Sequence, residues 1–197
     1  MFMHETTRRV FIWGAATLTA SGLLLGVQRI CSSAFADSEN GPDVGGPVKI
    51  ARFAADGTPA GIVSVSKVRK NLDAWRKQLT PLQFEVTRRA DTESAFSGAL
   101  DKEFSPGLYR CIDCDNALFN SHTKFDSGTG WPSFWAPIAQ ENVTEKSSMN
   151  FGTLLREVKC TLCDAHLGHV FTDGPKPTGL RYCMNSAALR FTPGVPG

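Results

Sequence analysis

The sequence predicts a mainly β domain of the α+β class, with helices at its N-terminal side. Apolar residues follow a helical period only between about Val65 and Asp91. After Asp91, short apolar runs alternate with Gly, Pro, Asp and Ser, a pattern typical of antiparallel strands joined by turns. The 197 residues leave room for one such core plus a tail. Strands are predicted at residues 107–111, 117–120, 157–160, 166–171 and 180–191.

Residues 1–36 are predicted to be a twin-arginine signal peptide. Arg8 and Arg9 precede a moderately apolar run, Val10 to Val27, and Ala34-Phe35-Ala36 forms a small-x-small cleavage site. Because the run is close to the shortest length that spans a bilayer, an uncleaved membrane anchor is the alternative. We therefore expect a periplasmic or otherwise exported protein, anchored to the membrane only if the signal is not cleaved.

The formal net charge is +2, and Arg8, Arg9 and Arg29 against Glu5 account for it. The rest of the chain is close to neutral, so it lacks the concentrated basic face that nucleic acid or an anionic membrane requires. We expect no nucleic-acid partner and no stable membrane association after cleavage. The mature protein is expected to be a monomer.

Residues 37–63 are predicted to be a flexible spacer, because Gly, Pro, Asp and Ser dominate there, with one short strand at residues 48–53. The folded domain would then span residues 64–197. A second helix begins after Thr80, because Thr80-Pro81-Leu82-Gln83 carries a capping box and a proline in the first turn. A first helix is predicted from about Val65, with an apolar stripe formed by Val68, Leu72, Trp75 and Leu79.

Two pairs of cysteines share the spacing CxxC: Cys111-Ile-Asp-Cys114 and Cys160-Thr-Leu-Cys163. Two intervening residues let a tight turn aim both thiolates at one ion, about 2.3 Å from a tetrahedral Zn²⁺. We predict one structural Zn²⁺ bound by all four cysteines, which would pin one sheet to another. Redox-active dithiols and structural disulfides are the alternatives.

Cys183 is the thiol that remains, since Cys31 lies within the predicted signal peptide. Strand alternation places Arg181, Cys183 and Asn185 on one face. A lone cysteine is usually a small core residue, but this one lies between a cation and an amide. A positive neighbour lowers the pKa of a thiol and favours the reactive thiolate, so Cys183 is the candidate nucleophile.

Two of the four histidines, His166 and His169, follow the second cysteine pair. One imidazole could be an alternative metal ligand, but four cysteines already complete a tetrahedral shell. The role that remains is proton donation near neutral pH. On an extended strand the two side chains would face opposite ways unless Gly168 bends the chain.

The segment Gly128-Thr-Gly-Trp-Pro-Ser-Phe134 predicts a rigid, sharply turned loop that displays large rings. Trp131 is either a core residue fixed by proline or a hydrophobic wall for a small apolar group, such as a methyl on sulfur. No Lys-Ser/Thr follows at the spacing of a phosphate-binding loop, which argues against that function.

Taken together, these motifs resemble the methionine-R-sulfoxide reductase family, B type. The similarity runs from about Val65 to Phe191, and it rests on five segments. These are Thr92-Glu93 with Phe96-Ser97-Gly98, Cys111-x-x-Cys114, Lys124 to Phe134, Cys160 to Phe171, and Asp173 to Ser186.

The resemblance implies two antiparallel sheets with flanking helices, and a Zn²⁺ site on the far side of the domain from the active site. It implies that residues 64–197 reduce the R-sulfoxide of free or peptide-bound methionine. With the predicted signal peptide, the substrates would be oxidised exported proteins, and the activity would be protein repair under oxidative stress.

The resemblance also implies a role for each site residue. Cys183 would attack the sulfoxide sulfur and become a sulfenic acid, while His169 would donate a proton to the departing oxygen. Arg181 would favour the thiolate of Cys183. The residues that would hold the site or the substrate are His166, Asn185, Trp131 and Phe134.

One position departs from the pattern of many family members. They carry a second, resolving cysteine in the Gly-x-Gly-Trp loop, where this chain has Thr129. The mature chain would have no other spare thiol. We therefore predict that oxidised Cys183 is reduced directly by an external thiol, either a thioredoxin-like protein or a small thiol.

Overall fold

The computed structural model describes residues 46–54, 56–150 and 153–194. The predicted signal peptide, Cys31 and the first part of the predicted spacer lie outside these residues. Within the described part of the chain, no helix is long and apolar enough to cross a membrane.

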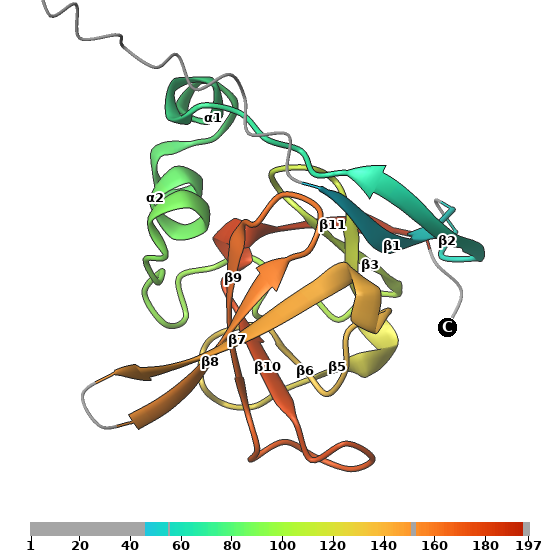
Figure 1. Ribbon diagram of the computed structural model, residues 1–197. Coiled ribbons are helices and arrows are strands. Elements are labelled where there is room, and N and C mark those ends of the chain that lie inside the picture. Colours follow the sequence, from blue (N-terminus) through green and yellow to red (C-terminus); the bar gives the residue numbers. More distant parts are fainter. Residues whose placement is uncertain (1–45, 55, 151–152, 195–197) are drawn as a thin grey trace, which may run out of the picture. The chain divides into compact units, whose positions relative to one another are not determined.

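The largest sheet has six antiparallel strands (Figure 1). In spatial order they are β5 (Lys124–Phe125), β6 (Ser133–Phe134), β10 (Arg181–Met184), β9 (His166–Phe171), β8 (Thr153–Cys160) and β7 (Val143–Asn150). A second sheet contains, in order, β11 (Leu189–Pro193), β3 (Gly107–Cys111) and β4 (Ala117–Asn120). The predicted mainly β class is therefore confirmed.

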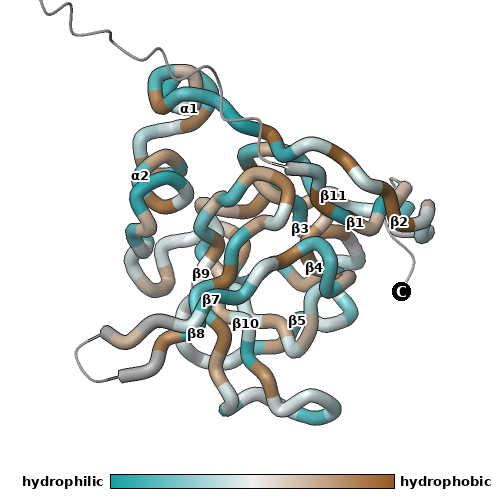
Figure 2. The backbone as a smooth tube through the Cα atoms, viewed as in Figure 1, coloured by the Kyte–Doolittle hydropathy of each residue, from teal (hydrophilic) through white to brown (hydrophobic). Residues whose placement is uncertain are grey.

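The described residues form a third sheet, whereas the family resemblance implies two. It is the hairpin of β1 (Pro47–Phe53) and β2 (Pro59–Ser66), which lies largely within the predicted spacer. The strand at residues 48–53 is confirmed, but β2 escapes prediction because Pro, Gly and Ser make up half of it. Figure 2 nevertheless shows apolar residues along β2. Ile50 is 1% exposed, and two hydrogen bonds join Asn142 to the Ala51 backbone, so β1 packs firmly on the domain.

The first helix, α1 (Leu72–Gln78), begins later than the predicted start near Val65. Val65 belongs to β2. The side chain of Asn71 accepts a hydrogen bond from a backbone N–H of the first turn, which fixes where the helix begins. Trp75 of the predicted stripe is buried, whereas Leu72 is exposed.

The second helix, α2 (Pro81–Arg89), has the predicted capping box. Thr80 and Gln83 each accept a hydrogen bond from the other's backbone N–H. Phe84 and Val86 are buried, so this helix presents an apolar face to the core.

Four of the predicted strands coincide with β3, β4, β9 and the end of β8. The fifth, residues 180–191, is instead divided between two sheets. β10 ends at Met184, the short 3₁₀ helix η3 (Ser186–Ala188) turns the chain, and β11 joins the three-stranded sheet. This change of sheet leaves Asn185 at a corner immediately after the strand that carries Cys183.

Aromatic side chains fill the space between the two larger sheets. Phe119 of β4 stacks on Phe134 of β6 with ring centroids 4.4 Å apart, and Tyr109 of β3 meets Phe134 edge-on at 4.9 Å. Tyr182 of β10 lies 5.9 Å from Phe119. All four side chains are fully buried, so this cluster holds β10 against the three-stranded sheet.

Candidate active site and metal centre

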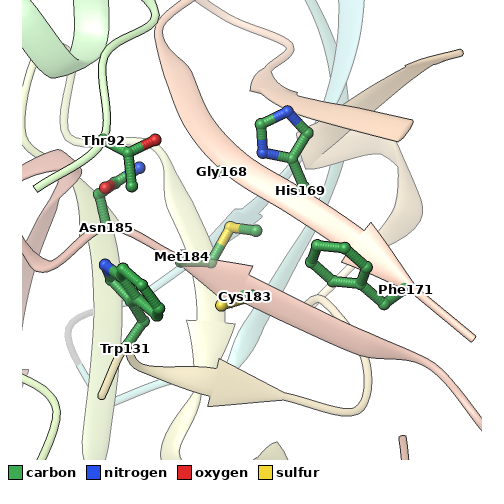
Figure 3. Close-up of a pocket in the computed structure, with 8 residues that line it drawn as sticks. All are labelled: Thr92, Trp131, Gly168, His169, Phe171, Cys183, Met184 and Asn185. Carbon is green, nitrogen blue, oxygen red and sulfur yellow. The ribbon is translucent and has the colours of Figure 1, made fainter. Parts of the chain in front are cut away.

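A cavity of about 150 Å³ lies over β9 and β10 (Figure 3). One side carries Trp131, Asn185 and Thr92, the other carries His169 and Phe171, and the Cys183 sulfur lies between them. Gly168 and Met184 complete the lining. The structure thus brings together four residues predicted from the sequence: Cys183, His169, Asn185 and Trp131.

The register of the six-stranded sheet explains why Cys183 and His169 share this cavity. Cys183 on β10 is the direct cross-strand partner of His169 on β9, and on its other side it pairs with Ser133 of β6. Direct partners in an antiparallel pair project to the same face, with Cβ atoms about 4.5–5.5 Å apart. Tyr182 and Met184, on either side of Cys183, are buried, as the predicted alternation requires.

The Cys183 thiol is half-buried and lies near hydroxyl groups. Thr129 Oγ1 lies 3.9 Å from its Sγ, and Ser127 Oγ lies 2.8 Å from both Thr129 Oγ1 and Ser133 Oγ. Burial raises the pKa of Cys183 and outweighs the hydrogen bond to Thr129 and the charge of Arg181, which lower it. Arg181 lowers the pKa of Cys183, but burial has the larger effect and favours the neutral thiol.

Arg181 lies beside the cavity rather than in its lining. Its Nε and Nη2 donate to the two carboxylate oxygens of Asp173 at 2.9 and 2.8 Å, and its guanidinium lies 4.4 Å from the Phe171 ring centroid. The bidentate carboxylate offsets much of the guanidinium charge, which weakens its effect on Cys183. By packing on Phe171, Arg181 also supports one side of the cavity.

The two histidines have different surroundings. Burial lowers the pKa of His169, and the charge of His166 lowers it further. His166 is 3% exposed, and its Nδ1 lies 2.8 Å from Glu157 Oε1. The two rings meet edge-on with centroids 5.4 Å apart. His166 is therefore a buried residue that packs against His169. It does not line the cavity, so its predicted place in the substrate site is not observed.

The pairing of β9 with β8 shifts by one residue between these histidines: Gly168 pairs with Val158 and His166 with Lys159, which leaves Leu167 as the extra residue. Gly168 also allows the close approach of β10, because an added Cβ would lie 2.1 Å from the carbonyl oxygen of Cys183. Glu157 of β8 is the cross-strand partner of His169 and also contacts His166. Both imidazoles consequently lie beside one carboxylate instead of on opposite faces of the sheet.

Glu93 ties the site together, and no sequence pattern assigns it a role. Its backbone N–H donates to Asn185 Oδ1 at 3.0 Å, and its carbonyl accepts from Trp131 Nε1 at 3.1 Å. Its buried carboxylate accepts from the backbone N–H groups of Ser186 and Ala187 at 2.5 and 2.8 Å. One residue therefore positions a wall of the cavity, the amide at its corner and the start of η3.

Phe134 is not part of the cavity, which corrects its predicted place in the substrate site. It is fully buried and stacks on Phe119 in the core. The physical reason is strand alternation, because Ser133 pairs with Cys183 and the next side chain must point to the opposite face.

Phe171, and not Phe134, supplies the second aromatic ring of the cavity. It lies two residues after His169 on β9, so strand alternation was the signal that could have found it. Thr92, the residue before Glu93, also lines the cavity. Its position there follows from the long-range contacts of Glu93, which no local sequence pattern predicts.

The four cysteines of the CxxC pairs meet at one point. Their Sγ atoms all lie within 4.8 Å of one another, with 3.6 Å between Cys111 and Cys163 and 3.6 Å between Cys114 and Cys160. Tetrahedral Zn–S bonds of about 2.3 Å place sulfurs about 3.8 Å apart, so the arrangement fits one Zn²⁺. Burial raises the pKa of Cys111, so four adjacent thiolates require a cation to be stable there.

Both CxxC pairs form the same local turn. The backbone N–H of Asp115 donates to the Cys111 carbonyl and that of Asp164 to the Cys160 carbonyl, each at 2.9 Å. Both aspartates are left-handed, with φ of +64° and +58°, a conformation that Asp tolerates. Cys111 ends β3 and Cys160 ends β8, so the cluster links the two larger sheets as predicted.

The SelR domain family model matches residues 79–193, a span that contains the cavity, Glu93 and the four-cysteine cluster. The chain belongs to the SelR domain family. "Peptide methionine sulfoxide reductase MsrB" of Pseudomonas syringae pv. syringae is 53% identical over 129 residues, which cover 66% of this chain and 98% of the relative. A relative of the same name from Hahella chejuensis is 51% identical over 127 residues, 64% of this chain and 91% of the relative.

This SelR-family chain carries elements before the matched residues that contact its cysteine cluster. Residues of β1, Ile50 to Phe53, line a small cavity together with Cys114. The backbone N–H of Val68 donates to the Leu162 carbonyl, inside the second CxxC turn, at 2.8 Å. The N-terminal elements therefore pack over the four-cysteine cluster, whereas all residues that line the cavity around Cys183 lie within the matched span.

Proposed function

We propose that this SelR-family enzyme reduces the R epimer of methionine sulfoxide, free or peptide-bound, with Cys183 as its nucleophile. The observation that carries the proposal is a single thiol in a largely apolar cavity, beside an imidazole and between two aromatic rings. A cavity of about 150 Å³ can hold a group the size of benzene, which suits a methylsulfinyl side chain. The family and the names of its relatives support methionine sulfoxide reduction.

In the proposed reaction, oxygen passes from the methionine sulfur to the cysteine sulfur. Cys183 attacks the sulfoxide, the S–O bond of the substrate breaks, and an S–O bond forms at Cys183. The thiol proton ends on that oxygen. Methionine leaves as a thioether and Cys183 becomes a sulfenic acid, so the step consumes no outside proton or electron.

His169 is placed to move the thiol proton. Because burial lowers its pKa, the imidazole is neutral near pH 7 and can accept a proton from Cys183, its cross-strand partner. The imidazolium then donates that proton to the departing oxygen, while Glu157 stabilises the transient charge. This sequence explains how a thiol with a raised pKa can react at neutral pH.

Trp131 orients the substrate, and Asn185 holds the corner of the cavity through its bonds to the Glu93 N–H and the Leu167 carbonyl. The indole of Trp131, fixed by its hydrogen bond to Glu93, offers an apolar wall for the methyl group. With the methyl group on that wall and the oxygen toward His169, only one epimer presents its sulfur to Cys183. We assign that epimer as R.

Regeneration of Cys183 requires an external reductant in this proposal. Thr129 lies beside Sγ but cannot form a disulfide, and the other described cysteines belong to the metal centre. One external thiol attacks the sulfenic acid, releases water and forms a mixed disulfide. A second thiol, from a thioredoxin-like protein or a small molecule, then restores the Cys183 thiol and leaves as the oxidised reductant.

The four clustered cysteines would hold one Zn²⁺, which neutralises their thiolates and ties the two larger sheets together. This ion takes no part in the reaction at Cys183. The residues present, with four sulfurs at tetrahedral spacing, fit that structural use.

We further propose that the protein is exported by the twin-arginine route and repairs oxidised exported proteins as a monomer. Support comes from Arg8-Arg9, the apolar run after them and the small-x-small site at Ala34–Ala36. N-terminal sequencing of the mature protein should begin at Asp37. A sequence that begins at Met1 would contradict cleavage.

The reaction is tested by incubating the purified chain with separate R and S epimers of N-acetyl-methionine sulfoxide and dithiothreitol. We expect the R epimer to be consumed and the S epimer to remain. Consumption of the S epimer, or of neither one by metal-replete protein, would overturn the proposal.

A further inference from the structure

The active-site cavity is too small to enclose more than the reacting side chain of a substrate. Its volume of about 150 Å³ matches a group of benzene size, and methionine sulfoxide has five heavy atoms beyond Cα. When the residue is part of a protein, its backbone and both neighbours must lie outside the cavity. Selectivity for a protein substrate therefore depends on the side chains at the rim.

Phe96 packs on Gly130, the residue before the cavity wall Trp131. Its backbone N–H donates to the Gly130 carbonyl at 2.8 Å, and its ring lies so close to Gly130 that an added Cβ there would approach ring carbons to 2.8 Å. Gly130 connects Thr129, which contacts Cys183, to Trp131. A second bond, from Trp131 Nε1 to the Glu93 carbonyl, ties the two segments again.

Phe96 also combines two features that a stable fold does not favour. Its side chain is 66% exposed, more than any other aromatic among the described large hydrophobic residues that reach the surface. Its φ of +62° is a left-handed conformation that bulky residues rarely adopt. Strain that the surrounding contacts maintain, in a ring presented to solvent where it packs on the loop that carries Thr129 and Trp131, indicates a role in binding.

We propose that Phe96 is a specificity-determining residue: its ring packs against an apolar side chain adjacent to the oxidised methionine in a protein substrate. The inference rests on the proposed function and adds to it a preference for sulfoxides in apolar sequence contexts.

The test compares three substrates in wild type and in Phe96→Ala, Phe96→Leu and Ile62→Ala. The substrates are N-acetyl-methionine R-sulfoxide amide, peptides with leucine before or after the sulfoxide, and the same peptides with aspartate at those positions. Ile62 on β2 is 59% exposed and serves as a matched apolar surface control.

We expect Phe96→Ala to lower kcat/KM for at least one leucine peptide roughly 5- to 10-fold, mainly through KM, because the apolar area that covers the leucine is lost. The blocked amino acid should change less than about 2-fold, and Phe96→Leu and Ile62→Ala should stay near wild type. An equal loss on all substrates would show that Phe96 only supports the Trp131 loop and would overturn the proposal, as would no loss on any peptide. If wild type reduces none of the sulfoxides, the proposed function fails instead, which is a separate outcome.

Discussion

Cys160 and Cys183 belong to the same six-stranded sheet, yet their surroundings differ in nearly every respect. Cys160 is fully buried at the end of β8, within 4.8 Å of three other sulfurs. Cys183 is half-buried on β10, with a hydroxyl 3.9 Å from its sulfur and an imidazole opposite in register. Four converging sulfurs suit a cation, whereas one sulfur beside a hydroxyl and an imidazole suits proton transfer and nucleophilic attack.

The two sites also differ in the sequence separation of the contacts that build them. Each half of the four-cysteine cluster is a local turn closed by a bond from an aspartate N–H to the carbonyl of the first cysteine. The cavity around Cys183 instead depends on Glu93, whose contacts to Asn185 and Ser186 reach across about 92 residues. The comparison shows that a thiol's role is set by its neighbours in space, and that only some of those neighbours are near in sequence.

The largest effect should come from removing the single reactive sulfur. Cys183→Ser is expected to lower turnover of the R-sulfoxide by at least about 1,000-fold, because the nucleophile is lost. The metal content and melting temperature should stay unchanged, since no metal ligand is altered. Activity assays with metal analysis check both statements, and measurable turnover by this variant would assign the nucleophile elsewhere.

The second effect should separate the metal centre from the active site. Cys111→Ser, or a strong chelator on the wild type, is expected to remove the metal and lower the melting temperature by at least about 10 °C, because metal binding contributes folding free energy. Differential scanning calorimetry with Cys183→Ser as the control measures this. A purified protein without bound metal, whose melting is unaffected by chelator, would refute the metal centre.

The third effect should fall on activity with little change in stability. Glu93→Gln keeps the shape of the side chain but turns an N–H donor toward the backbone N–H groups of η3. Because the side chain then no longer fixes Ser186 and Ala187, the adjacent Asn185 and the backbone of residue 93 that holds Trp131 lose their support, and we expect kcat/KM to fall roughly 10- to 100-fold. The drop should appear in kcat as well as KM.

A matched control for that experiment is Glu103→Gln, whose carboxylate accepts a hydrogen bond from the backbone N–H of nearby Ser105 and from no residue of the cavity lining. It should behave like wild type. If Glu93→Gln also retains full activity, Glu93 does not position the site, and the cavity is maintained by its other contacts.

The smallest effect should be a change in the protonation of Cys183. The hydrogen bond to Thr129 and the charge of Arg181 both lower its pKa, so Thr129→Val and Arg181→Gln should each raise it. The pH dependence of iodoacetamide alkylation reports this, since only the thiolate reacts. The midpoint should move to higher pH in both variants and stay in place in Arg76→Gln on α1. A shift to lower pH would contradict the assigned causes.

The predictable parts of the molecule are those that local patterns encode. The capping box at Thr80, the CxxC turns and the alternation around Cys183 depend on residues within a few positions of each other, and the structure confirms them. The division of residues 180–191 between two sheets was not predictable, because η3 is capped by the carboxylate of Glu93 far away in sequence. Strand β2 was missed for a different reason, since its composition is that of a loop.

The site itself was predicted in part. Cys183 and His169 were both predicted, but only the strand register shows that they lie side by side. Strand alternation directs Phe134 into the core and Phe171 into the cavity, the reverse of what was predicted for Phe134. His166 proved to be a buried partner of Glu157 rather than a cavity residue. These differences have one physical origin, because which face a side chain takes depends on strand boundaries and register that the sequence leaves open.

The most direct test of the contrast between the two cysteine sites is to follow oxidation after one equivalent of methionine R-sulfoxide without reductant. Dimedone trapping and peptide mass spectrometry would then identify the modified cysteine. We expect one sulfenic acid, on Cys183, with the four clustered cysteines unmodified and their metal retained. A disulfide between Cys183 and any clustered cysteine, with release of the metal, would contradict the account.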